Sequence, residues 1–288
     1  MRLGCHLSIA KGFAAAVDEA ASLDTTALQL FSHNASTWRM KDITAAAAAG
    51  FRERVRASPL EAVVVHTMYL LNLASPDDDL YEKSVAALVE EVERARLLGV
   101  DLLVTHLGSH RGSGVEVGVA RIASALDRVV ASGPFRRHRR LTLLFENTAG
   151  AGSSLGGDFA ELGEILRSLE KPGRVGVCLD TCHALAFGYE LRSRDGIAKT
   201  LRDFDREVGL ARLAVVHLND SVFPKGSHRD RHEHLGRGAI GREGLSLLVN
   251  HPSLRDLPFL LETPKDLDGR PDADRVNLDL VRSWRHDG

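Results

Sequence analysis

The sequence predicts an α/β protein folded as one (β/α)8 TIM barrel, with its functional site at the C-terminal ends of the strands. Eight short apolar runs alternate with segments of helical periodicity, and charged or imidazole side chains end six successive runs. Eight alternating units favour a closed barrel, although an open doubly wound sheet also fits the count. The chain has 288 residues, 44% of them hydrophobic, which suits one barrel of about 250 residues with insertions. We therefore expect a single domain over residues 1–288, with two ordinary domains as the alternative.

The expected strands are short runs that are apolar on both faces, as buried parallel strands are. They cover Leu3–Leu7, Ala27–Phe31, Ala62–Val65, Leu102–Thr105, Leu141–Phe145, Val175–Leu179, Leu213–Val216 and Phe259–Leu261.

Segments between these strands have the periodicity of amphipathic helices. They include Gly12–Leu23, Leu80–Leu98 and Val115–Val130, where apolar residues recur three or four positions apart. No Gly-x-Gly-x-x-Gly follows the first strand and no phosphate loop occurs, which disfavours folds that bind a nucleotide cofactor.

Composition limits the class of protein. No apolar run reaches the roughly 18 residues that a membrane helix needs, and the N-terminus lacks a signal-peptide pattern. We expect a soluble, cytoplasmic protein with no membrane partner. The three cysteines have neither zinc-finger spacing nor an even number, so we expect reduced, mostly buried thiols at Cys5, Cys178 and Cys182.

The net charge of −2 does not indicate a protein that is basic overall, so any surface that attracts nucleic acid must be a local basic one. One arginine-rich run precedes a strand and is expected as a solvated loop on the face opposite the strand ends. It contains Arg136, Arg137, Arg139 and Arg140. A second set of basic residues is a better candidate for contacting phosphate, because it shares one stretch of the sequence with acidic and histidine residues. It contains Lys225, Arg229, Arg231 and Arg237.

The residues that end the strands carry the functional information. From the third strand to the eighth they are His66, His106, Glu146, Asp180, His217 and Glu262. They are 34 to 45 residues apart, about one strand and helix unit each. In a barrel the C-terminal strand ends converge on one mouth. Each residue alone could be a buried histidine or a helix-capping acid, but six in succession favour a shared site.

Two motifs extend this set, namely Asp180-Thr-Cys-His183 and Asp230-x-His232. The nine candidates are five histidines, two glutamates and two aspartates. A catalytic zinc ion takes about three protein ligands, so nine residues suit about three ions with a bridging carboxylate. Five imidazoles disfavour magnesium, while manganese or iron is less easily excluded.

These motifs also resemble a known family, endonuclease IV, the zinc-dependent apurinic/apyrimidinic endonuclease of base-excision repair. The resemblance rests on several runs in the same order, and these are His66-Thr-Met-Tyr69, His106-Leu-Gly-Ser, Leu144-Phe-Glu146-Asn-Thr-Ala-Gly150, Leu179-Asp180-Thr-Cys-His183, His217-Leu-Asn-Asp-Ser221, Asp230-Arg-His232-Glu-His-Leu-Gly and Leu261-Glu262-Thr-Pro264.

The resemblance implies a barrel with three zinc ions. It assigns His66, His106 and Glu146 to the first, the bridging Glu146 with Asp180, His217 and Glu262 to the second, and His183, Asp230 and His232 to the third. It further implies that a metal-activated hydroxide hydrolyses the phosphodiester 5′ to an abasic site in duplex DNA. The products would be a 3′-hydroxyl and a 5′-deoxyribose phosphate, with Glu146 and Glu262 as catalytic residues.

Acting on an abasic nucleotide requires its extrusion from the helical stack. Tyr69 resembles the family residue that inserts beside the extruded nucleotide. The family commonly has an arginine wedge after the second strand, and Ser36 stands at that position here. We therefore expect Trp38 or Arg39 to substitute, or Tyr69 to carry more of the work, with Arg231 as a further DNA contact.

The remaining histidines are expected at the surface or beside ligands. These are His33, His110, His138, His228, His234, His251 and His286, while His6 ends the first strand beside the mouth. The glycine-rich loop Ala149–Gly157 would let a DNA backbone approach closely or would simply be flexible.

Two rival functions fit parts of the pattern. A barrel sugar isomerase or epimerase would use one or two ions and would leave Asp230 and His232 unexplained. A zinc-stabilised protein that binds DNA damage without turnover is less consistent, because structural zinc sites tend to be closed and cysteine-rich. We expect a monomer with no nucleotide cofactor.

Overall fold

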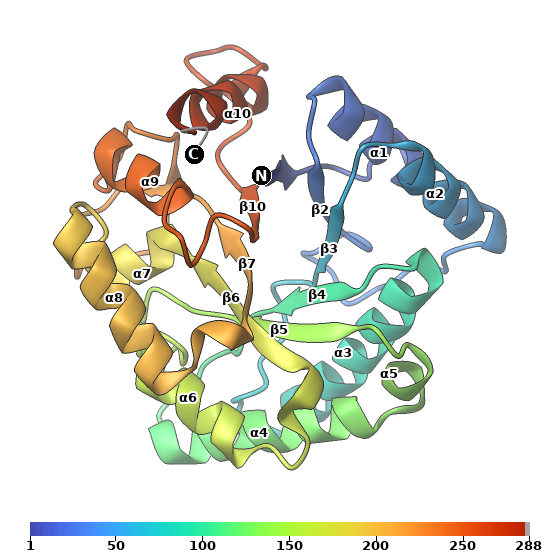
Figure 1. Cartoon of the computed structure of the whole chain (residues 1–288). Coiled ribbons are helices and arrows are strands. Elements are labelled where there is room, and N and C mark those ends of the chain that lie inside the picture. The colour runs from blue at the N-terminus through green and yellow to red at the C-terminus, as the bar shows by residue number, and fades with distance from the viewer. Residues whose placement is uncertain (286–288) are drawn as a thin grey trace.

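Eight parallel strands close into a barrel in the computed structural model, which describes residues 1–285 (Figure 1). Around the barrel the strand order is β1-β10-β7-β6-β5-β4-β3-β2. Each barrel strand therefore lies beside the next barrel strand in the sequence, and the last pairs with the first. The predicted barrel is confirmed. His286 lies outside the described residues.

The barrel strands are β1 Arg2–His6, β2 Ala27–Phe31, β3 Ala62–His66, β4 Leu102–Thr105, β5 Thr142–Glu146, β6 Val175–Asp180, β7 Leu213–His217 and β10 Pro258–Leu261. Two short strands, β8 Asp220–Ser221 and β9 His232–Glu233, pair antiparallel outside the barrel. The third, fifth, sixth and seventh barrel strands each run one residue beyond the predicted end, so that His66, Glu146, Asp180 and His217 are their last residues.

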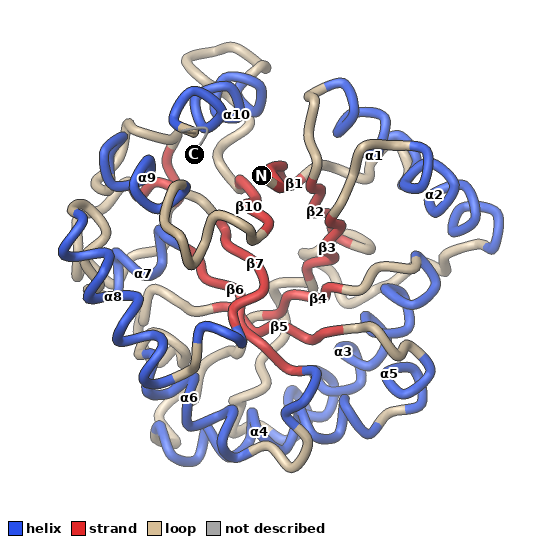
Figure 2. The backbone as a smooth tube through the Cα atoms, viewed as in Figure 1, coloured by secondary structure: helices blue, strands red, loops and turns tan. Residues whose placement is uncertain are grey.

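Helices form an outer ring around the strands (Figure 2). They are α1 Phe13–Ser22, α2 Ala45–Ala57, α3 Asp78–Leu98, α4 Val115–Ala131, α5 Gly133–Arg137, α6 Phe159–Ser168, α7 Thr181–Phe187, α8 Arg194–Glu207, α9 Gly241–Val249 and α10 Ala273–Trp284, with 3-10 turns at Pro172–Arg174 and Leu210–Arg212. Among residues 1–285, no helix is long and apolar enough to cross a membrane.

Local sequence sets the helix ends. The side chain of Asp77 accepts a hydrogen bond from the Leu80 amide at 3.0 Å, which caps α3, and acidic residues follow in the first turn. Gly99, with φ of 71°, ends the same helix in the left-handed conformation that glycine adopts at little cost. The arginine-rich run differs from the expected loop, because Arg136 and Arg137 end the short helix α5; their side chains are exposed.

The barrel interior holds a small separate hydrophobic cluster. Its fully or almost fully buried members are Ala27, Ala62, Val64, Val104, Leu144, Cys178, Val215 and Leu260. Side chains two positions apart along a strand lie on the same face. A residue two positions beyond a cluster member therefore projects inward as well, but nearer the C-terminal mouth.

A cluster of histidine and acidic residues at the barrel mouth

Six of the nine predicted ligands follow a member of the interior cluster by two positions. The pairs are Val64 and His66, Val104 and His106, Leu144 and Glu146, Cys178 and Asp180, Val215 and His217, and Leu260 and Glu262. The alternation of the strands therefore turns all six side chains into the mouth of the barrel.

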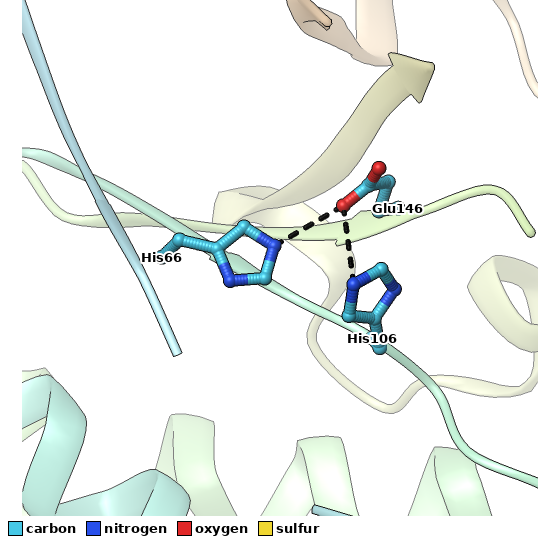
Figure 3. A group of neighbouring side chains, drawn as sticks. All are labelled: His66, His106 and Glu146. Atoms are coloured by element: carbon cyan, nitrogen blue, oxygen red, sulfur yellow. Dashed lines mark hydrogen bonds and ion pairs between the residues drawn. The ribbon is translucent and has the colours of Figure 1, made fainter. Parts of the chain in front are cut away.

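The first group consists of His66, His106 and Glu146 (Figure 3), whose ligand atoms all lie within 4.8 Å of one another. The Nε2 atoms of His66 and His106 lie 3.2 and 3.7 Å from the same Oε2 of Glu146. Both imidazoles come from neighbouring strands and face one carboxylate oxygen. This is a compact set of two nitrogens and one oxygen.

The second group shares Glu146 with the first and adds Asp180, His217 and Glu262. His217 Nδ1 lies 3.1 Å from Glu146 Oε1 and 3.3 Å from Glu262 Oε2. Glu146 thus presents Oε2 to the first group and Oε1 to the second, which is the arrangement of a bridging carboxylate.

The third group contains His183, Asp230 and His232. Oδ1 of Asp230 lies 3.1 Å from His183 Nε2 and 3.7 Å from His232 Nε2. Its members come from helix α7 and from the segment that includes β9, rather than from barrel strands. The carboxylate of Asp230 is 55% exposed, so this group is the one most open to solvent.

Asp180 connects a strand to a helix. It ends β6 and caps α7, where its Oδ1 accepts from the His183 amide at 2.8 Å. Its other oxygen accepts from the Asn219 side chain at 2.7 Å, and its own amide donates to Asn147 Oδ1 at 2.6 Å. These bonds fix Asp180 with respect to both β7 and α7.

Hydrogen bonds on the outward side orient three of the imidazoles. Nδ1 of His66 donates to the Thr67 carbonyl at 2.7 Å, Nδ1 of His183 to the Asn147 carbonyl at 2.9 Å, and Nδ1 of His232 to the Glu262 carbonyl at 3.1 Å. In each case Nε2 remains for the mouth. Such outward bonds are typical of histidines that bind metal ions.

Opposite charges at close range shift the pKa values of the group. Burial alone would raise the pKa of the Glu146 carboxyl, but His217 and His106 outweigh it and hold this pKa well below its usual range. The pKa of Glu262 falls to about 2, since His217 overcomes the effect of burial. Burial lowers the pKa of His106 to about 4, which keeps its imidazole neutral at pH 7. These are the forms of Glu146, Glu262 and His106 that bind metal. In spite of burial, the neighbouring carboxylates raise the pKa values of His66, His183 and His217, so a metal ion would have to displace a proton from these imidazoles.

The donor set fits a metal ion better than it fits a hydrogen-bond network. The Nε2 atoms of His183 and His232 are buried and lack a hydrogen-bond partner among the described residues. Carboxylate oxygens lie only 3.1 and 3.4 Å away, but not in hydrogen-bonding directions. Buried polar atoms without partners are costly. A cation held between nitrogen and oxygen would satisfy both atoms.

A buried carboxylate organises the loop that follows the third group. Asp220, at the start of β8, accepts hydrogen bonds from five backbone amides: Ser221, Gly236, Gly238, Ile240 and Gly241. Because β8 pairs with β9 through Ser221 and His232, the same side chain supports the strand that carries His232.

The residues predicted to contact DNA differ in their surroundings. Tyr69 is 61% exposed, and its ring centroid lies 6.0 and 6.2 Å from those of His66 and His106, so it stands at the rim of the first group. Arg39 and Arg231 are exposed. Trp38 is half-buried against the core, with Lys83 Nζ 4.3 Å from its ring centroid.

Ser36 is exposed and forms a hydrogen bond with its neighbour Asn34, and Tyr69 donates its amide to the Ala35 carbonyl, which joins the loops that follow β2 and β3.

The structure adds three side chains that the sequence did not single out. Gln29 and Asn219 form hydrogen bonds with carboxylates of the second group. Cys182, expected only as a buried thiol, also lies within ligand distance of Asp180 and His232. The two-residue spacing from Ala27 could have indicated Gln29, but Asn219 and Cys182 follow strand ends without any periodic signal.

Comparisons with known proteins agree with this arrangement. The family of xylose isomerase-like TIM barrels matches residues 17–284. A probable endonuclease 4 of Halothermothrix orenii is 44% identical over 281 residues, covering 96% of this chain and 99% of that protein. The crystal structure of endonuclease IV from Thermus thermophilus superposes with a TM-score of 0.86 at 41% identity, over 99% of this chain and 98% of that one.

A more distant similarity concerns the fold alone. The D-psicose 3-epimerase of Clostridium cellulolyticum superposes with a TM-score of 0.71 at 14% identity, over 99% of both chains.

Proposed function

This chain belongs to the endonuclease IV family and is an apurinic/apyrimidinic endonuclease of DNA repair; we propose that it hydrolyses the phosphodiester 5′ to an abasic site in duplex DNA with three zinc ions. The products would be a 3′-hydroxyl and a 5′-deoxyribose phosphate. The observation that carries this proposal is the gathering of nine histidine and acidic side chains into three groups at one mouth.

The three groups would each hold one ion. His66, His106 and Glu146 would hold the first, and Glu146, Asp180, His217 and Glu262 the second. His183, Asp230 and His232 would hold the third. Mixed nitrogen and oxygen donors suit zinc, with manganese as a partial substitute.

Bound zinc would lower the pKa of water to about 7 and neutralise charge on the phosphate oxygens. Glu146 and Glu262 are the residues to which we assign catalytic roles, because both face the second group and Glu146 also faces the first. Their ionised carboxylates would orient the imidazoles.

Substrate selection is assigned to exposed side chains on the rim. Tyr69 stands beside the first group and would lie against the space left by an extruded nucleotide. Arg39 and Arg231 would approach phosphates, since both are exposed cations. Trp38 stays among the candidates, although its packing under Lys83 favours a role in holding the loop.

A duplex with one tetrahydrofuran abasic analogue tests the function, because this analogue cannot break by β-elimination. Zinc-loaded protein should incise on its 5′ side and leave an end that a polymerase extends, and Glu262→Gln should abolish incision. Tight binding without incision would instead indicate a damage-binding protein. Neither binding nor incision, with about one or two metal ions per chain, would indicate a sugar isomerase or epimerase.

Three smaller proposals accompany the function. We propose that residues 1–288 form one catalytic domain, that the protein acts as a monomer, and that it works in the cytoplasm. Size-exclusion chromatography with light scattering on the zinc-loaded protein would test the second of these.

A further inference from the structure

The sequence contains a single glutamine, Gln29, and the structure buries it completely beside the second group. Gln29 lies in β2, two positions beyond Ala27 of the interior cluster, and therefore projects into the mouth. His6 of β1 is hydrogen bonded to it. The two strands that supply no proposed ligand thus supply this pair.

The orientation of the Gln29 amide follows from its partners. Its nitrogen lies 2.6 Å from Glu262 Oε1 and 3.1 Å from His6 Nδ1. A reversed amide would place its oxygen against the Glu262 carboxylate oxygen, where two acceptors would repel. The nitrogen must therefore face Glu262, and the amide oxygen must face the opposite side.

On that opposite side, Gln29 Oε1 lies 2.8 Å from His217 Nε2. An amide oxygen only accepts, so His217 carries a proton on Nε2 and donates it. In the neutral imidazole the lone pair is then on Nδ1, which faces oxygens of Glu146 and Glu262 at 3.1 and 3.3 Å. The amide therefore directs His217 Nδ1 into the second group.

This role differs from that of the neighbouring imidazoles. His66, His183 and His232 donate to backbone carbonyls, which no substitution removes. His217 donates to a side chain, and the same side chain also holds Glu262. One residue thus sets the direction of two of the four members of the second group.

We propose that Gln29 is a positioning residue that fixes the Nε2–H form of His217 and the orientation of Glu262, and so preorganises the second group for a divalent cation. This inference rests on the proposed function, because it takes both residues as ligands.

The variant Gln29→Met tests it, since methionine has a similar length and volume but no comparable donor or acceptor. Chelator competition on the purified full chain should show that one zinc ion binds about 10- to 100-fold more weakly, the usual cost of removing an outer hydrogen bond to a ligand. Asn277→Leu is the matched control. This buried amide contacts His234 Nδ1, the Leu235 amide and Thr263 Oγ1 but no proposed ligand, so its loss should leave all zinc affinities unchanged.

The fold is checked by urea unfolding of both variants. If Gln29→Met is as stable as Asn277→Leu and binds all its zinc as the unchanged protein does, the inference is wrong. If the unchanged protein itself binds no zinc, the proposed function fails instead.

A second measurement needs no variant. Cell-free synthesis with ¹⁵N-labelled glutamine gives one side-chain amide signal pair, because the chain has one glutamine. Both protons should be protected from solvent exchange, and the pair should shift as zinc fills the second group. A rapidly exchanging pair that stays unmoved through full zinc loading would overturn the inference even if Gln29→Met does not fold.

Discussion

Replacing Asp220 with asparagine should destabilise the protein severely and loosen the segment that carries the third group. Asp220 is fully buried, and its two carboxylate oxygens accept from five backbone amides. Asparagine has nearly the same shape but offers one acceptor oxygen and one NH₂ donor. The substitution therefore changes the hydrogen bonding with little change in volume.

The magnitude follows from the geometry. With the new oxygen in place of Oδ1, the bonds from Ser221 and Ile240 at 2.8 Å and the longer bond from Gly241 at 3.4 Å are kept. The NH₂ then faces the amides of Gly236 and Gly238, which lie 2.9 and 3.0 Å from Oδ2. The opposite orientation also leaves two amides without an acceptor, those of Ser221 and Ile240. A buried donor without a partner costs about 1–3 kcal/mol, so two such donors should cost at least about 2 kcal/mol.

Urea unfolding followed by circular dichroism measures this cost, and zinc counting measures the local effect. We expect Asp220→Asn to lower the free energy of unfolding by at least about 2 kcal/mol. We also expect it to weaken the third zinc, because β8 and β9 are paired. Asp268→Asn is the control, since that carboxylate is exposed and pairs with Arg237 on the surface. A loss below about 1 kcal/mol for Asp220→Asn would refute the reasoning.

Three other predictions concern separate parts of the molecule. Arg94→Met should lower the free energy of unfolding by about 3 kcal/mol, because the buried guanidinium donates to Ser32 Oγ and to the Ser32 and Lys41 carbonyls, and all three acceptors would lose a donor. Urea unfolding checks this. Glu91→Gln in the same chain should recover part of the loss, because Ser32 Oγ links the buried Glu91 carboxylate to Arg94. Burial raises the pKa of the Cys5 thiol to about 12, so almost no thiolate is present at pH 8. Ellman's reagent at pH 8 should therefore not label Cys5 until guanidinium unfolds the protein. Labelling of Cys5 in the folded protein within minutes would contradict this prediction. Elemental analysis should find about one zinc ion fewer in Asp230→Asn but about two fewer in Glu146→Gln, because Glu146 is shared by the first and second groups whereas Asp230 belongs to the third alone. Equal losses would argue against the bridge.

The sequence predicted the barrel and the convergence of the strand ends because both follow from periodicity. Buried parallel strands are apolar on both faces, so a histidine or carboxylate where such a run ends stands out, as at His66 and Glu146. The predicted boundaries stopped one residue short there for the same reason. The apolar pattern ends before the strand does, since the last inward side chain is polar.

Other features depend on contacts that periodicity does not encode. Gln29 lies inside a strand rather than at its end, and only the closure of the barrel brings it against β7 and Glu262. Four of the five amides that donate to Asp220 come from a turn 16 to 21 residues later. The burial of Trp38 depends on α3, because Lys83 of that helix covers its ring. Each of these is a tertiary contact between distant segments.

The supports of the three groups differ in kind, and this bears on how the site forms. In the first two groups every ligand comes from a barrel strand or the residue after one, so strand pairing and the buried interior cluster fix these side chains. The third group draws on α7 and on a two-residue strand outside the barrel. Its position therefore depends on two carboxylates that are not shared with the first group, Asp180 at the start of α7 and Asp220 beneath the loop. The third group, the most exposed of the three, is thus held at the barrel mouth by carboxylates that accept hydrogen bonds from backbone amides. The barrel strands themselves do not fix its position.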